Sequence, residues 1–321
     1  MILSFNFQNS YFWLNLINPA FLVELLSNVK ILDYVKSLNI EIPQLEKFQK
    51  LSQIFKIYPS ATKEESLRNY ERGILLYSLV TKFRPKHILE IGRAQGYSTM
   101  CMAWALNKNQ IDGDIISVDP IPFDSANNFF VDWENDQEPK FQEISTSELW
   151  KRYADKNLLN KITVLTCYSD ELLEKNLPKF DFCYIDGHHI YEAVMCDFSV
   201  FLNKANEQFA CLFDDYSVNA ITKMDKAIDG IRALFGGGLL IKEDDSSKNN
   251  SLKTSQDILC LCESRNLISD SKYSDFIKHS VEYIMKYRKI RKRYQFRQKI
   301  NKAIPPLAHV RLSKIFKKDS E

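Results

Sequence analysis

The sequence predicts an α/β fold with a doubly wound, mostly parallel sheet of seven strands. Short apolar runs alternate with segments that are mostly long enough for a helix, which is the pattern of βαβ units. The runs show little polar alternation, as expected for parallel strands that helices cover on both faces. They lie at residues 87–92, 114–120, 161–167, 180–186, 209–215, 238–243 and 257–263.

The last two runs are predicted to form a reversed hairpin that closes the sheet. A helix near 223–235 and the glycine turn 236–238 precede the first of them, and the polar loop 244–255 separates the two. A loop of that composition suits an antiparallel connection.

Helices are predicted on either side of the strand region. Apolar residues at helical spacing indicate a helix within 11–38. Thr62 and Glu65 have the spacing of a capping box, and the helix they open should end before Pro85. The long connection 121–160 should carry a helix over 147–158, and it is either a lid or packing decoration, with decoration favoured.

The composition indicates a globular protein with an unevenly placed charge. Hydrophobic residues make up 45% of the chain and its formal charge is +2, which disfavours disorder. Residues 281–321 hold 13 Lys or Arg against 3 Asp or Glu, so a basic tail follows an acidic body. Seven scattered cysteines without a CxxC pair suit a reducing compartment. The apolar N-terminus has neither a basic n-region nor an unbroken apolar span, so we expect a cytoplasmic protein.

A glycine turn follows the first strand. Gly92 and Gly96 permit a tight turn and close approach of the backbone to a ligand, and Ser98 lies where a helix N-terminus favours an anionic group. The GxxxG spacing lacks the middle glycine of a dinucleotide site, which weakens the interpretation as an NAD site. Glu90 suits a ligand with an ammonium group, such as the amino-acid end of S-adenosylmethionine. An ordinary β–α turn without a ligand is equally compatible with the spacing alone.

The next two strand ends carry further candidate cofactor contacts. Asp119 ends the second strand, where a carboxylate can accept hydrogen bonds from both ribose hydroxyls. Ser169 and Asp170 follow the third strand and are placed to meet the edge of an adenine. Each of these residues could be a helix N-cap instead, and for Ser169 the two interpretations have equal weight.

Three carboxylates are predicted to meet at one edge of the sheet. Asp186 ends the fourth strand, and Asp214 and Asp215 end the fifth. Carboxylates this close repel one another unless they are protonated or neutralised by a cation. An all-oxygen set fits Mg²⁺, whereas zinc and non-haem iron prefer more nitrogen or sulphur.

Four segments together carry a family resemblance: residues 88–99 (ILEIGRAQGYST), 117–120 (SVDP), 184–198 (YIDGHHIYEAVMCDF) and 211–216 (CLFDDY). They resemble the class I S-adenosylmethionine-dependent methyltransferases, which have a Rossmann-like sheet. The nearest group is the metal-dependent O-methyltransferases related to macrocin O-methyltransferase and the cephalosporin hydroxylase-like proteins, and catechol O-methyltransferase is a more distant relative.

The resemblance implies roles for individual residues. Asp186, Asp214 and Asp215 match the metal-binding acids of these enzymes, and His189 falls where relatives place a general base. His188 stands where relatives often have an acidic residue, and a surface loop position is favoured for it over a functional one. The implied divisions are an N-terminal helical extension (1–60), a methyltransferase domain (61–265) and a basic helical tail (266–321).

We therefore expect an S-adenosylmethionine- and Mg²⁺-dependent O-methyltransferase that acts on a sugar-containing or other small-molecule hydroxyl. An RNA methyltransferase rests on the basic tail alone, and the Asn-Pro-Pro-Tyr type motif for base amines is missing, so nucleic acid is disfavoured. A noncatalytic binding module and an NAD oxidoreductase are less favoured hypotheses. The tail could lie on an anionic membrane as a peripheral contact, pack on the acidic body, or join a second subunit in a homo-oligomer. A solvated charged helix without a partner has about equal weight.

Overall fold

A computed structural model describes residues 29–55, 70–131, 140–216, 221–243, 258–266 and 270–303. Within these ranges, only the backbone is described for a few residues, among them 127–131 and 297–303. The predicted helical residues 11–28 and the capping box of Thr62 and Glu65 lie outside the described residues.

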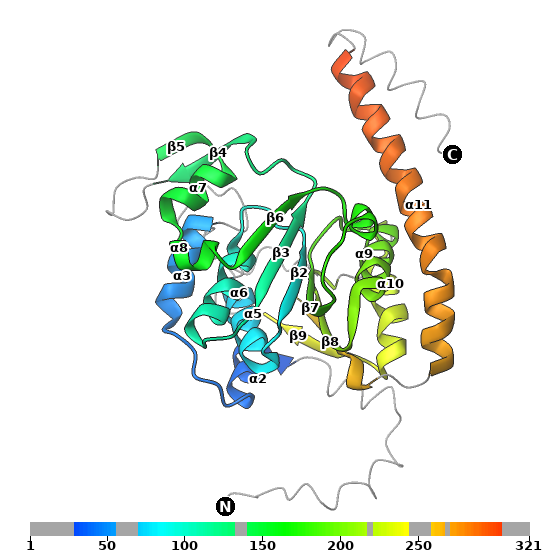
Figure 1. Ribbon diagram of the computed structural model, residues 1–321, viewed down its shortest axis with the longest axis horizontal. Helices are drawn as coiled ribbons and strands as arrows, with labels where there is room; N and C mark the ends of the chain where they lie inside the picture. The colour runs from blue at the N-terminus through cyan, green and yellow to red at the C-terminus, as the bar shows by residue number, and fades with distance from the viewer. Residues whose placement is uncertain are drawn as a thin grey trace, which may run out of the picture.

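All seven predicted strands are present in one sheet (Figure 1). The sheet order is β1-β9-β10-β8-β7-β2-β3-β6. Its parallel part pairs β6 with β3, β3 with β2, β2 with β7 and β7 with β8, and β10 runs antiparallel to both β8 and β9, which confirms the reversed hairpin. The bounds are β2 (His87–Ile91), β3 (Asp114–Asp119), β6 (Ile162–Thr166), β7 (Phe180–Ile185), β8 (Ala205–Phe213), β9 (Leu239–Lys242) and β10 (Ile258–Glu263).

The sheet has an eighth strand that the sequence did not predict. β1 (Val29–Lys30) pairs in parallel with β9, and Val29 lies opposite Ile241. Of the described part of the helix expected within 11–38, Ile31–Ser37 is helical as α2, and Val29 and Lys30 are extended instead. Pairing along the edge satisfies backbone groups of β9 that would otherwise be unpaired, which outweighs helical spacing in so short a segment.

Helices cover both faces of the sheet (Figure 1). One core lies under α2, α3 (Leu45–Phe55), α5 (Tyr70–Phe83) and α6 (Tyr97–Lys108). The other lies under α9 (Tyr191–Lys204), α10 (Met224–Arg232) and α11 (Asp270–Ala303). The strands alternate between them, since Ile88 belongs to the first core and Leu89 to the second.

The long connection contains more structure than the sequence predicted. β4 (Ala126–Val131) and β5 (Lys140–Ser145) form a separate antiparallel hairpin. The single helix expected over 147–158 is two: α7 (Thr146–Tyr153), which Ser145 and Glu148 open with a capping box, and α8 (Lys156–Leu159). Asp155 accepts a hydrogen bond from the backbone N–H of Asn157, so a new N-cap interrupts the helix at this point.

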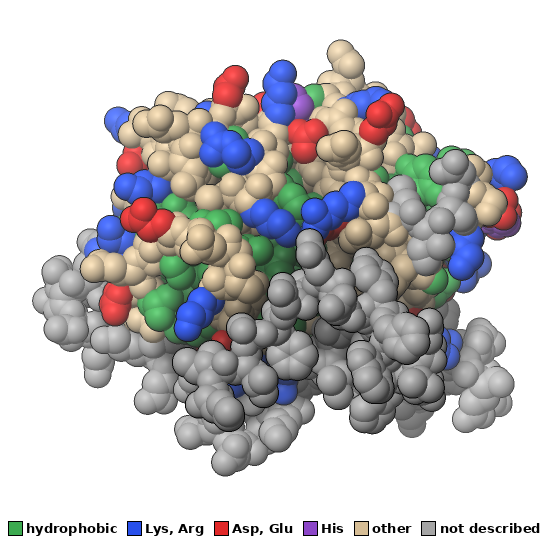
Figure 2. Space-filling model, turned by 90° about the horizontal axis from the view of Figure 1, so that it is seen from below, with side chains coloured by type: hydrophobic (Ala, Val, Ile, Leu, Met, Phe, Trp, Pro, Cys, Tyr) green, Lys and Arg blue, Asp and Glu red, His purple; other side chains and the backbone are tan. Residues whose placement is uncertain are grey.

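The basic tail forms α11, a helix of 34 residues that packs against α9 (Figure 1). Phe276, Ile284 and Tyr287 are buried in this contact. Among the helices of the described ranges, none combines the length and the apolar character needed to cross a bilayer. On the side of the molecule seen from below in Figure 2, Lys and Arg side chains are interspersed with Asp and Glu.

Candidate functional site

The first glycine of the turn allows two strand ends to approach each other. Gly92 has a φ of +94°, and a Cβ at this position would lie 1.8 Å from the backbone oxygen of Asp186. The backbone N–H of Asp186 donates to the carbonyl of Ile91 over 2.8 Å. Gly92 is therefore required to bring the end of β7 against the end of β2.

The second glycine makes room for an indole. Gly96 has a φ of +101°, and a Cβ there would lie 2.3 Å from the ring of Trp150. Trp150 Nε1 donates to the carbonyl of Gln95 over 2.8 Å, which joins α7 to the turn. Both glycines thus allow a close approach of protein groups, and the approach of the turn to a ligand stays a prediction.

Glu90 is buried beneath the turn. Its carboxylate accepts hydrogen bonds from the hydroxyls of Ser98, Thr99 and Ser117, and burial raises its pKa. It does not line either of the two cavities beside the turn, whereas Ser98 lines the smaller one. Glu90 fastens the first turn of α6 to the strands, and its contact with an ammonium group stays a prediction.

Asp119 closes the glycine turn from the next strand. Its carboxylate accepts from the backbone N–H groups of Arg93 and Ala94, each over 3.1 Å, and from that of Ile121 over 2.8 Å. The same residue lines a cavity of about 520 Å³ at the carboxyl ends of the strands. That volume is typical of a pocket for a small ligand. The prediction that Asp119 faces a ribose is compatible with this position.

The two candidate adenine contacts have partners within the protein. Ser169 lines the same cavity and donates to the buried carboxylate of Asp197. Asp170 is fully buried, and its two oxygens accept from Arg288 and Arg291 of α11, each over 2.6 Å. Its carboxylate is thereby committed to α11, which the sequence did not predict.

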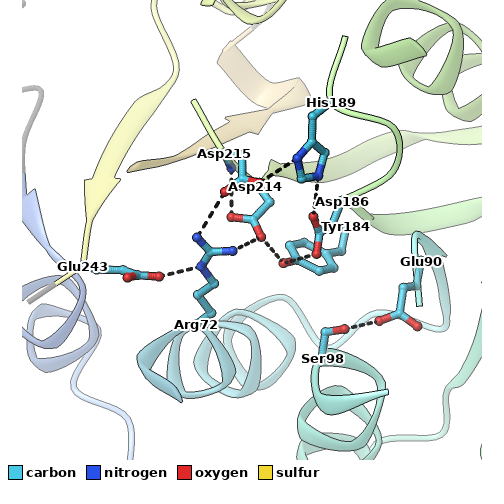
Figure 3. A network of polar contacts seen from close by, with 9 residues as sticks. All are labelled: Arg72, Glu90, Ser98, Tyr184, Asp186, His189, Asp214, Asp215 and Glu243. Carbon is cyan, nitrogen blue, oxygen red and sulfur yellow. Dashed lines mark hydrogen bonds and ion pairs between the residues drawn. The ribbon is translucent and has the colours of Figure 1, made fainter. Parts of the chain in front are cut away.

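Asp214 belongs to a closed ion-pair network (Figure 3). It accepts from Arg72 Nη1 and, over 2.8 Å, from the hydroxyl of Tyr184. Arg72 also donates to Glu243 over 2.5 Å and to Asp215 over 3.1 Å. All of these side chains are buried, so Asp214 is already neutralised by the protein. The structure does not show it as a free third ligand of the predicted trio.

A second group of side chains, which is partly open to solvent, lies beside the closed network. His189 Nε2 is 3.3 Å from Asp186 Oδ1, and His189 Nδ1 is 3.1 Å from Asp215 Oδ2 (Figure 3). One ligand atom of each of the three residues lies within 4.8 Å of the other two, which suits a metal ion. The side chain of His189 is 41% exposed and that of Asp186 28%. We call this group the open cluster.

The electrostatics of the open cluster favour an added cation. Burial, followed by repulsion from Asp214, raises the pKa of Asp186 to about 7 and that of Asp215 to about 6. The hydrogen bond to Asp186 raises the pKa of His189 to about 9. The network and the cluster together hold four carboxylates against Arg72 and His189, so a divalent ion would neutralise the excess negative charge. The residues therefore fit a divalent cation.

Two candidate functional residues, Arg93 and His188, were not predicted from the sequence. Arg93, within the glycine turn, is buried, and its Nε and Nη1 have no hydrogen-bond partner among the described residues. His188 is exposed, as expected for a surface loop, but it also lines the large cavity and has its Nδ1 3.3 Å from the hydroxyl of Tyr287. The sequence did contain a sign of Arg93: a large basic residue directly after Gly92, within the glycine turn. For His188 no local signal existed, because its partner lies on α11.

Part of the chain is similar to known proteins. Residues 89–216 match a family described as "Methyltransferase domain". No curated protein shows significant similarity to the chain. Among solved structures, an O-methyltransferase from Bacillus cereus in complex with S-adenosylhomocysteine has 14% identity and a TM-score of 0.44, with 75% of this chain and 99% of that chain covered. The O-methyltransferase TomG from Streptomyces achromogenes, involved in tomaymycin synthesis and solved with S-adenosylmethionine, has 17% identity and a TM-score of 0.44, with 71% and 92% covered.

Proposed function

We propose, from the premise that residues 89–216 form an S-adenosylmethionine-dependent methyltransferase domain, that this protein methylates a hydroxyl oxygen with the help of a divalent cation, Mg²⁺ in the first place. The observation that carries the proposal is the open cluster of Asp186, His189 and Asp215. It lies beside a cavity that reaches from Gly92 and Asp119 to Asp186, so the cofactor and the cluster can share one site.

Asp186 and Asp215 are the residues that would hold the cation. Mg²⁺ in enzymes is commonly held by one or two carboxylates, with waters and substrate oxygens completing its shell. Asp215 is fixed by Arg72, whereas Asp186 is the more accessible of the two. When bound, the cation supplies positive charge that lowers the pKa of the acceptor hydroxyl.

His189 is the general base of the proposed reaction. Between two charged carboxylates its imidazole is protonated near neutral pH, because both contacts favour the cationic form. A cation held by Asp186 and Asp215 would offset the contacts that raise the pKa of His189, and the ring could then accept a proton. The acceptor hydroxyl then gives its proton to a ring nitrogen of His189.

The methyl group is transferred from the cofactor to the acceptor in a single displacement. The acceptor oxygen forms a bond to the methyl carbon while the carbon–sulphur bond breaks and its electron pair stays on sulphur. The products are a methyl ether and S-adenosylhomocysteine, and the proton remains on His189. Holding oxygen, carbon and sulphur in line supplies much of the acceleration, since positioning replaces a random encounter. Arg93 offers unpaired N–H groups at the turn for an anionic group such as the carboxylate of the cofactor.

The proposed acceptor is a hydroxyl of a sugar-containing or other small molecule. RNA is the alternative acceptor: Arg288 and Arg291 of α11 are paired with Asp170, whereas Lys289, Lys292 and Arg293 are exposed. A cytoplasmic location, contact of the tail with an anionic membrane, and a homo-oligomer stay predictions.

The proposal is tested by methyl transfer from labelled S-adenosylmethionine to a panel of glycosides, catechols and short RNAs, with added Mg²⁺ and with EDTA. We expect transfer to a hydroxyl compound that EDTA abolishes and Mg²⁺ restores. Transfer that EDTA leaves unchanged would overturn the role of the cation. Transfer to RNA alone would overturn the acceptor class.

A further inference from the structure

We infer that the C-terminal helix α11 is part of the cofactor site and that Arg291 and Tyr294 bind the adenosyl end of S-adenosylmethionine. This inference rests on the proposed function and adds residues far outside the matched methyltransferase segment, which ends at residue 216. The helix that was predicted as a basic tail would thus form one wall of the active site.

The first observation is the lining of the large cavity. Tyr287, Ile290, Arg291 and Tyr294 of α11 line it together with Asp119 and Tyr168. Asp119 marks the ribose position predicted from the strand ends, so the α11 side chains bound the part of the cavity that an attached adenine would reach. Flat apolar surfaces with a few polar groups are typical of such a pocket.

The second observation is that α11 is held firmly in place. Arg288 and Arg291 both bind the fully buried Asp170, and Lys286 Nζ lies 3.1 Å from Glu192 on α9. Ile284 and Tyr287 are buried against α9 and its neighbours. Because an unpaired buried carboxylate is strongly unfavourable, Asp170 needs these arginines. These contacts therefore hold α11 against the rest of the fold.

The third observation concerns the side chain of Arg291. Its guanidinium lies 4.2 Å from the centre of the Tyr168 ring, and Nη1 binds Asp170 and Glu171. Its Nε is buried and has no hydrogen-bond partner among the described residues. A buried N–H without an acceptor is costly, and a ring nitrogen of adenine or a ribose oxygen in the cavity would satisfy it.

The fourth observation is an exposed aromatic at the cavity rim. Tyr294 is 59% exposed although it lines the cavity. An aromatic side chain that is open to solvent on one face gains from stacking with a flat base. Adenine offers such a face, and its nitrogen atoms are acceptors for the N–H of Arg291.

The test measures binding of S-adenosylhomocysteine and of 5′-methylthioadenosine, which lacks the amino-acid end, by calorimetry on the full chain. Tyr294→Ala should weaken both ligands by roughly tenfold, as expected for the loss of one stacking partner. Arg291→Lys keeps the charge beside Asp170 but loses the Nε–H and the flat face, and should weaken both by roughly threefold or more. Phe296→Ala and Arg293→Lys are matched controls on the same helix, outside the cavity lining, and should leave both affinities unchanged.

The outcomes separate the inference from the proposed function. If the wild-type protein binds S-adenosylhomocysteine and Tyr294→Ala and Arg291→Lys bind both ligands equally well, the inference is wrong and the proposed function stands. If either variant binds more tightly, α11 obstructs the cavity and the inference is likewise wrong. If the wild-type protein binds neither ligand, the proposed function fails and the inference fails with it.

Discussion

Asp214 and Asp215 are neighbours in the chain, yet they belong to regions of opposite character. Asp214 lies in the closed network, where Arg72 and Tyr184 satisfy its carboxylate. Asp215 reaches from that network into the open cluster, where it contacts His189 and lies near Asp186. Arg72 binds Asp214, Asp215 and Glu243, whereas Asp186 has no guanidinium contact in the described ranges and pairs with the imidazole of His189. A carboxylate without a fixed counter-charge, rather than the number of carboxylates, therefore marks the place for a cation.

Arg72→Met should have the largest effect, and it acts on the closed network. The change removes the guanidinium that binds the buried Asp214 and Glu243, so we expect a loss of roughly 3–5 kcal/mol in the free energy of unfolding. Urea unfolding of the variant measures it. Arg265→Met is the control, because Arg265 pairs with Glu263 at the surface, where such a pair contributes about 0–1 kcal/mol. Equal losses of unfolding free energy in Arg72→Met and Arg265→Met would show that Arg72 stabilises the fold no more than a surface ion pair does.

His189→Ala should break the open cluster without affecting the closed network. Loss of a general base lowers methyl transfer by roughly 10²–10⁴-fold, while binding of S-adenosylhomocysteine and thermal stability should change little. His87→Ala is a matched control, since His87 pairs with Asp114 over 3.0 Å at the opposite ends of the strands. A His189→Ala variant with wild-type turnover would remove the proposed base.

Asp197 sharpens the comparison, because this buried carboxylate has a hydroxyl donor in Ser169 but no basic partner in the described contacts. Burial raises its pKa from 3.8 to about 7. The folded state therefore holds a proton that the unfolded state releases, so this residue's contribution to stability is present below about pH 4 and is lost as the pH rises through 7. The shift corresponds to no more than about 4 kcal/mol.

Asp197→Asn should remove that dependence. The melting temperature of the variant, relative to wild type, should rise between pH 5 and pH 8, because only the wild-type protein must ionise a buried group. Asp229→Asn, at an exposed surface pair, is the control and should show no such trend. A difference between Asp197→Asn and wild type that does not change with pH would contradict the raised pKa.

Much of the fold could be predicted from local pattern. The continuous apolar runs predicted the seven strands. The acidic residues at the ends of three of these runs, Asp119, Asp186, Asp214 and Asp215, were correctly predicted to lie at one edge of the sheet. β1 was missed because two residues at an edge carry no periodic signal. The β4–β5 hairpin was missed because its strands lie in a mixed, acidic segment without apolar alternation.

The sequence could not predict which carboxylates pair with basic side chains of the protein and which are available to a cation. Arg72 is more than a hundred positions away from Asp214, and only the folded chain shows that it binds Asp214 and Asp215 and leaves Asp186 with His189. The same holds for Asp170, whose partners Arg288 and Arg291 come from α11. Gly96 also illustrates the limit, since the sequence indicated close approach but could not show that Trp150 was the neighbour.

Direct titration of Mn²⁺ or Mg²⁺ into chelator-treated protein tests the central claim, with calorimetry or electron paramagnetic resonance as readout. We predict one site in the wild-type protein, its loss in Asp186→Asn and in Asp215→Asn, and its retention in Asp214→Asn. A wild-type protein that binds no divalent ion, or an Asp215→Asn variant that binds it as well as wild type, would contradict the account.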